Sequence, residues 1–224
     1  MTGKKLQGAK TDLATEEEFL MKNDKSRLLL FISIILFTLL IFSAPVRSAE
    51  PAPSFKEYSS TGDYFTCSIP ADWRIYQPAF GLSEEEKKVY GITLFGPATI
   101  PAAPPTLSVH YYAPGNRLHG SMERFVLVHA APVLGFVAEG KSYGKVQEIE
   151  FAGRKAETFD RIDIRYIGER SLHPQKVSVF ERFIVVPEKN HQGFYALKLS
   201  VPVDAKEEYL TVFERFTKSF TPRK

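Results

Sequence analysis

The chain has 224 residues, enough for one ordinary domain and a targeting segment, and its composition (44% hydrophobic, 25% charged) is that of a globular protein rather than a disordered one. Residues 1–48 hold seven of the 29 Lys and Arg and five of the 26 Asp and Glu, so the rest of the chain has 22 basic and 21 acidic residues. This balance excludes the strongly basic surface by which proteins bind nucleic acid.

The first patterned segment is an uncharged apolar run at residues 28–44. As a helix it would span about 26 Å, close to the ~30 Å of a hydrocarbon core. Three basic residues precede it, which keeps its N-terminal side in the cytoplasm and exports the remainder of the chain. Two interpretations remain open. We favour a signal peptide cleaved between Ser48 and Ala49; the alternative is an uncleaved single-pass anchor of the inner membrane with the domain outside.

The composition of the chain separates an N-terminal targeting region from a folded domain. Met21 begins a better-shaped signal sequence than Met1, so residues 1–20 are predicted to be disordered or an over-extended start. The folded part is expected in the periplasm or otherwise outside the cytoplasm. The predicted organisation is a cytoplasmic or over-extended stretch at 1–27, a signal or anchor region at 28–48, a Pro-rich linker at 49–54 and a folded domain at 55–221.

The domain begins with a pattern of short strands. Residues 55–60 and 64–70 are predicted to form a hairpin around the turn at 61–63. The single cysteine, Cys67, falls on the apolar face of the second strand, because alternate side chains of a strand share a face. This position predicts a buried small hydrophobe rather than a nucleophile or a disulfide partner.

A short helical turn and two strands come next. Ser83 and Glu86 form a capping box, which predicts a helix start at this point. Strands are predicted at 89–95 and 106–112. The loop between them, at 97–105, contains four prolines and is either a spacer or a docking lip.

The middle of the chain combines a helix with two strands. Apolar residues at 3–4 residue spacing predict a central helix over 121–138, with serine at its N-cap and Pro132 expected to kink or divide it. Strands are predicted at 143–151 and 155–167. The apolar residues of the second strand change faces partway, which predicts a β-bulge near 160–161.

The last elements are two strands and a helix. The strand at 176–186 is apolar on both faces, which indicates a central strand covered from both sides. Another strand is predicted at 194–201 and a helix at 205–220. Hairpin-length connections favour a largely antiparallel sheet with helices packed on it. The apolar stripe of the last helix has a 4-3-4 spacing (Tyr209, Phe213, Phe216 and Phe220).

The segment from Tyr64 to Trp73, with Phe65, Pro70 and Trp73 at its key positions, resembles the Phe-x-x-x-x-Pro-x-x-Trp strand and corner of PsbP-like and DcrB-like proteins. The central helix and the closing segment 217–220 are similar to that superfamily too, and the likeness covers roughly residues 55–220. It implies an α+β fold, namely an α/β/α sandwich whose mostly antiparallel six- to seven-stranded sheet is covered by a central and a C-terminal helix. It also implies non-enzymatic exported domains.

The chain departs from that superfamily in three ways. It has no lipoprotein cysteine after the apolar run, it has Asp72 where glycine is frequent, and it carries the proline loop at 97–105. No binding residue is therefore carried over from the resemblance.

No motif of a catalytic, metal or cofactor site is present, so no catalytic residue, metal ligand or cofactor is predicted. Asp160 and Asp163 lie three apart on a strand and are expected on opposite faces unless the predicted bulge intervenes, and opposite faces would prevent paired acid–base work. His129 is expected to be a core residue. His110 and Tyr112, on one face of their strand and beside the proline loop, form the predicted recognition patch; the alternative is an ordinary solvated or helix-covered sheet face.

The sequence thus predicts a non-enzymatic, exported accessory or binding domain of the cell envelope that docks on a protein assembly. The alternatives are a small-ligand or lipid carrier with a pocket between sheet and helices, and an envelope hydrolase without a recognisable motif. The expected partner is an envelope protein rather than nucleic acid. Membrane contact would run through residues 28–44 if that segment stays uncleaved.

Overall fold

The structure, a computed structural model, describes residues 53–77, 81–98, 103–132, 135–167, 172–190 and 192–224. The chain divides into two compact units, residues 1–51 and 52–224, and every described residue belongs to the second. Ser48, Ala49 and the apolar run at 28–44 lie outside the described residues. Within the described ranges, no helix has both the length and the apolarity that a membrane span needs.

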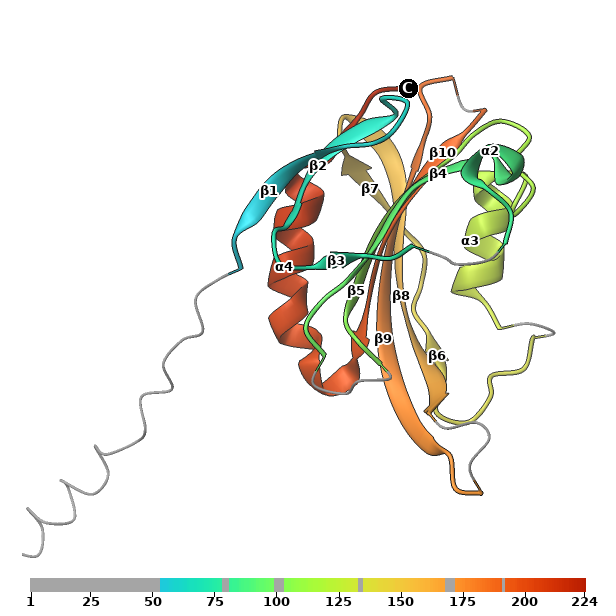
Figure 1. The fold of residues 1–224 in the computed structure, drawn as a ribbon. Helices are drawn as coiled ribbons and strands as arrows, with labels where there is room; N and C mark the ends of the chain where they lie inside the picture. Colours follow the sequence, from blue (N-terminus) through green and yellow to red (C-terminus); the bar gives the residue numbers. More distant parts are fainter. Residues whose placement is uncertain (1–52, 78–80, 99–102, 133–134, 168–171, 191) are drawn as a thin grey trace, which may run out of the picture. The chain divides into compact units, whose positions relative to one another are not determined.

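An antiparallel sheet forms the middle of the second unit (Figure 1). Short β6 and β7 follow one another along the same edge of β8, so the sheet is seven strand positions wide and the predicted six- to seven-stranded antiparallel sheet is confirmed. Across the sheet the order is β3 (Arg74–Ile75), β4 (Val89–Phe95), β5 (Thr106–Tyr112), β10 (Phe194–Pro202), β9 (Gln175–Pro187), β8 (Arg154–Ile167), and then β6 (Ser142–Tyr143) and β7 (Gln147–Phe151).

A second, smaller sheet contains the predicted N-terminal hairpin. Strands β1 (Phe55–Ser59) and β2 (Phe65–Pro70) pair as expected, but they pair with β11 (Thr221–Pro222) rather than with the main sheet. The small sheet and helix α4 lie on the same side of the main sheet (Figure 1). The two ends of the domain are therefore joined in one layer.

Helix α4 (Lys206–Lys218), preceded by the 3-10 turn η2 (Val203–Ala205), covers one face of the main sheet. Its predicted apolar stripe is confirmed at Tyr209, Phe213 and Phe216, which are buried in one core cluster with side chains of β5 and β10. Phe220 is buried in the same cluster but follows the end of the helix, which was predicted to reach residue 220. Cys67 lies in the same cluster and is 2% exposed. Burial raises the pKa of its thiol to about 12, so the prediction of a buried hydrophobe is confirmed.

Helix α3 (Met122–Ala130) covers the opposite face and is shorter than predicted (Figure 1). Ser121 is its N-cap, as expected, and its hydroxyl accepts a hydrogen bond from the Arg124 amide. The helix ends at Ala130 because Ala131 precedes Pro132, and a residue before proline is driven to extended backbone (φ −134, ψ 153). The predicted extension to residue 138 is therefore wrong.

Ser121→Ala is expected to lower the free energy of unfolding by about 1 kcal/mol, the usual cost of removing a serine N-cap. Urea unfolding followed by circular dichroism measures the change. Ser178, an exposed strand residue, provides the matched control, because Ser178→Ala removes a hydroxyl without removing a cap. Equal effects of the two substitutions would show that the cap contributes nothing.

The predicted bulge in β8 is absent, and this prediction was wrong. The register between β8 and β9 is continuous from Glu157 opposite Val185 to Ile167 opposite Gln175. The extra residue lies in the neighbouring strand, between the β6 and β7 pairings, and it divides the predicted strand 143–151 in two. Strand β8 has apolar residues on both faces because elements cover both: Phe159 packs on the α3 side and Ala156 on the α4 side.

Strand β9 is buried from both sides, as its sequence predicts. Val179 and Phe183 face the α3 side, whereas Phe180 and Ile184 face the α4 side. The short helix α2 (Glu84–Lys87) has the full capping box, in which the Ser83 hydroxyl accepts from the Glu86 amide and Glu86 accepts from the Ser83 amide. This turn stands beside the open edge of β4 (Figure 1).

Candidate functional site: a groove at the edge of the sheet

A groove of about 700 Å³ runs along the β4 edge of the sheet, and we call it the His110 groove. Its floor includes His110 and Tyr112 of β5 together with Gly91 and Thr93 of β4. Its rim carries apolar side chains that are roughly half exposed: Ile75 (46%), Tyr76 (50%), Leu82 (47%) and Leu118 (49%).

The register of the sheet places His110 in a pit. Gly91 of β4 lies opposite it on one side and Ala196 of β10 on the other. Gly91 has no side chain, so the imidazole is open toward β4, whereas Ala196 is buried in the core cluster under α3. The ring of Tyr112 stands edge-on to the imidazole, with 6.4 Å between the ring centroids. A Cβ at Gly91 would overlap the Val109 carbonyl oxygen and come within 2.8 Å of the His110 Cα, so this position requires glycine.

Two hydrogen-bonded supports hold the rim of the groove in place. The Glu84 carboxylate of α2 accepts from the Gly91 amide at 3.1 Å, which fixes α2 against the edge of β4. The buried Asn116 side chain accepts from the backbone amides of Leu118, His119 and Gly120. Because that amide oxygen fixes the turn, Leu118 is held at the rim.

The His110 ring on the floor is neutral at pH 7, and the charged residues that line the groove are Glu84 and Lys87. Burial, together with the smaller effects of the nearby charges of Lys198 and Lys87, lowers the pKa of His110 to about 4. Within the described part of the chain, no residue is hydrogen-bonded to the His110 imidazole. At neutral pH the ring therefore has one N–H donor and one acceptor nitrogen without a protein partner.

The structure brings the two predicted recognition residues together on one face of β5, where both line the groove. The described part of the proline loop, residues 97–98 and 103–105, lies elsewhere, which corrects its predicted place beside them. The Gly96 amide donates to the Pro105 carbonyl at the far end of the β4–β5 hairpin, and Ala103 packs on β9. The loop connects Phe95 to Thr106 at one end of the hairpin, whereas the groove lies near the other end, where Val89 pairs with Tyr112.

The other candidate residues stay outside the groove. Asp160 pairs with Arg182 on the α4 side, and Asp163 pairs with Lys141 on the other, so their prediction on opposite faces is confirmed. His129 stacks on Phe183 at the end of α3. Among the described residues, no three His, Cys, Asp or Glu side chains lie close enough to hold a metal ion.

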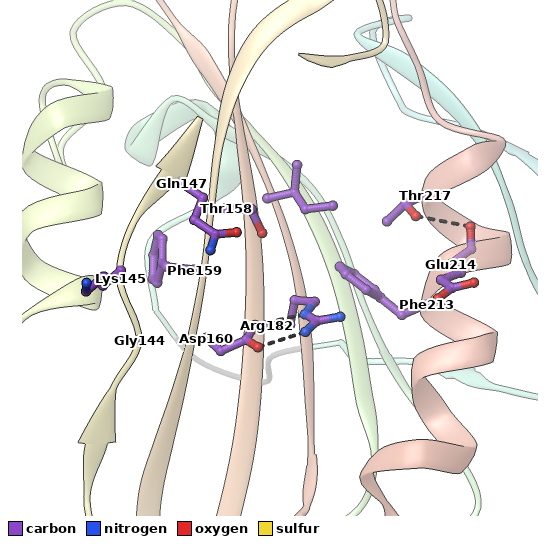
Figure 2. Close-up of a pocket in the computed structure, with 11 residues that line it drawn as sticks. Gly144, Lys145, Gln147, Thr158, Phe159, Asp160, Arg182, Phe213, Glu214 and Thr217 are labelled. Carbon is purple, nitrogen blue, oxygen red and sulfur yellow. Dashed lines mark hydrogen bonds and ion pairs between the residues drawn. The ribbon is translucent and has the colours of Figure 1, made fainter. Parts of the chain in front are cut away.

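A second cavity, of about 430 Å³, lies between α4 and strands β8 and β9 (Figure 2). Arg182 and Asp160 cross its floor in a bidentate pair, with both N–O distances 2.8 Å. Glu214 and Thr217 approach from α4, while the Phe159 ring points away toward α3 (Figure 2). The charged floor favours polar over acyl-chain contents, because an acyl chain would remove the ion pair from water without replacing its hydrogen bonds.

Fold and groove define a small α+β sandwich domain with an apolar-rimmed surface groove. No family model matches the chain, and no curated protein matches it.

Solved structures similar to the chain include the cyanobacterial PsbP protein of Synechocystis, with 13% identity and a TM-score of 0.45 over 80% of this chain and 100% of that one. Another is LpqN of Mycobacterium tuberculosis, involved in cell envelope biogenesis, with 17% identity and a TM-score of 0.38 over 78% of this chain and 86% of that one. A Bacteroides thetaiotaomicron protein is also similar (12%, 0.40, 75% and 48%), and the chain spans about half of its length. The resemblance of the sequence to PsbP-like and DcrB-like proteins stays a prediction.

Proposed function

We propose that the protein is an exported, non-catalytic binding domain of the cell envelope that docks on a protein partner through the His110 groove. The observation that carries the proposal is the groove rim, where four large apolar side chains from three separate segments stand about half exposed around one hollow. Exposed apolar surface bordered by polar residues is typical of interaction sites.

The groove favours binding over catalysis. General acid–base chemistry needs a titratable group that a second group orients. Glu84, the carboxylate that lines the groove, accepts from the Gly91 amide, and the His110 ring has no orienting partner among the described residues. The carrier alternative has less support, since the cavity between sheet and helix has an ion pair on its floor.

Export is proposed from the sequence. The apolar run at 28–44 and the expected cleavage between Ser48 and Ala49 support a folded domain on the outside of the membrane. A reporter fused after Lys224 that is active only in the cytosol would contradict export and, with it, an envelope partner.

Affinity capture from envelope extracts after mild crosslinking tests the docking proposal. We expect a partner that wild-type protein captures and that the groove variants Tyr76→Asp and Leu118→Asp lose, because a carboxylate on the rim would have to be desolvated in the complex. Tyr166→Asp is the matched control, since Tyr166 is equally exposed (54%) on β8 and lies outside the groove. Capture that all three variants retain would contradict docking through this groove.

A further inference from the structure

We propose that α3 is an acid-sensitive cover of the sheet, which protonation of His129 releases while α4 stays packed on the opposite face. The release concerns the fold itself and is independent of docking through the His110 groove. It follows from the small contact that holds α3, from the hydrogen bond that His129 accepts at the end of this helix, and from the charges that surround its ring.

Helix α3 is held to the sheet by a small apolar contact. Two of its nine residues, Phe125 and Val126, are buried, whereas α4 buries five of thirteen. Leu127 and Val128, the next apolar residues of α3, are exposed. An element with so little buried apolar surface can open locally before the domain unfolds as a whole.

The polar link between α3 and the sheet runs through an arginine of β8. The Nη1 atom of Arg161 lies 3.4 Å from His129 Nδ1 and 3.3 Å from the His129 carbonyl oxygen, in the last turn of the helix. Because an arginine N–H can only donate, His129 Nδ1 must accept, and the ring is neutral in this contact. The same guanidinium forms an ion pair with Glu181 of β9.

Protonation of His129 breaks this link. Nδ1 would then carry a proton that faces the Arg161 guanidinium, so two donors and two positive charges would meet. A positive charge in the last turn of a helix is ordinarily favourable. Arg161 already provides that charge, because it donates to the carbonyl oxygen at this end of α3. A second cation at the same place therefore opposes the first.

The charged and titratable groups that face His129 come from four elements. Arg161 lies on β8, Glu181 on β9 and Lys198 on β10. The His119 ring, from the segment between β5 and α3, lies 5.3 Å from the His129 ring between centroids. Glu181 favours the protonated ring, but three cations already share its carboxylate.

These surroundings set the sign of the pH dependence. Burial first, and then Arg161, His119 and Lys198, lower the pKa of His129 from 6.5 to about 4. In the released helix the ring is solvated and regains its ordinary pKa, so the released state binds a proton more tightly than the packed state. Release is therefore favoured as the pH falls from about 6.5 to about 4.

Release of α3 would uncover an aromatic layer on its face of the sheet. The Phe125 ring rests on the rings of Tyr112, Phe183 and Phe194, with 5.5 to 6.3 Å between centroids. The opposite cover differs, because α4 contains no histidine and the described residues of the core cluster beneath it include none. Acid therefore acts on one cover of the sheet.

Hydrogen exchange followed by mass spectrometry tests the release. The full-length chain, in phosphatidylcholine nanodiscs, is compared at pH 7 and pH 4. Protection factors remove the effect of pH on the exchange chemistry. The full pKa shift of His129 would favour release about a hundredfold at pH 4, and solvent screening of the partly exposed ring reduces this factor. We expect the protection of α3 to fall about tenfold relative to that of α4. An equal fall in both helices, or none in α3, would overturn the proposal.

A neutral replacement assigns the effect to one ring. His129→Gln has an amide oxygen that can accept from Arg161, and it stays uncharged at both pH values, so the relative fall should disappear. His173→Gln, at an exposed histidine before β9, is the matched control and should keep it. A relative fall that His129→Gln retains would also overturn the proposal. The wild-type comparison of α3 with α4 decides the question if this variant fails to fold.

Discussion

Glu181→Gln is expected to lower the free energy of unfolding by about 3 kcal/mol. The side chain is 4% exposed and neutralises Arg161, Arg165 and Lys198 on the α3 face of the sheet. These contacts hold the pKa of Glu181 below its usual range although burial alone would raise it. Removing one member of a buried ion cluster leaves uncompensated charge, and that loss costs about 3–5 kcal/mol.

Urea unfolding at neutral pH measures the effect, and two variants serve as controls. Glu214→Gln breaks an exposed pair with Lys218 on α4 and should stay within about 0.5 kcal/mol of wild type. The double variant Glu181→Met, Arg161→Met removes both charges of the closest pair and should regain part of the loss. If Glu181→Gln is as stable as wild type, the cluster is not a structural ion network.

Stability is also expected to fall as the pH drops from about 6.5 to about 4. His110 and His129 both have pKa values lowered from 6.5 to about 4, chiefly by burial. The unfolded chain therefore takes up protons at a higher pH than the folded chain does, so acid favours unfolding. One unit of pKa shift corresponds to about 1.4 kcal/mol. At the acid end of the window, the shift of His110 therefore lowers the free energy of unfolding by roughly 3 kcal/mol. The loss from His129 is smaller, because solvent partly screens that ring.

The groups that face each ring support this sign. His129 meets Arg161, His119 and Lys198, which oppose its protonation, whereas Glu181 favours it. Unfolding curves at several pH values in that window measure the slope, and the double variant His110→Gln, His129→Gln should flatten it. A wild-type slope that the double variant retains would show that other groups cause the acid sensitivity.

The alternation of apolar residues predicts much of the fold, because the number of buried faces of a strand determines which of its positions are apolar. The two apolar faces of β9 correctly predicted a central strand. The apolar stripe of α4 correctly predicted a helix packed on the sheet. The same rule failed at β8. Apolar residues on both faces of a strand indicate either a bulge or two covering layers, and only the position of α3 decides between them.

Two floor residues of the candidate site could be predicted. His110 and Tyr112 share a face by strand periodicity alone, whereas the rim residues Ile75, Leu82 and Leu118 come from three separate segments. Their meeting depends on long-range contacts, such as the hydrogen bond from the Gly91 amide to Glu84, that no local pattern encodes. The one local signal was the Pro-Gly-Asn turn at 114–116, whose asparagine holds Leu118.

Site-specific photocrosslinking in living cells tests the central claim most directly. A benzophenone side chain is placed at Leu118 on the groove rim, or at Tyr166 on β8 as the control of similar exposure (49% and 54%). Docking through the His110 groove predicts a defined higher-mass protein adduct from position 118 and none from position 166. An adduct from position 166 alone, or no protein adduct from position 118, would contradict it.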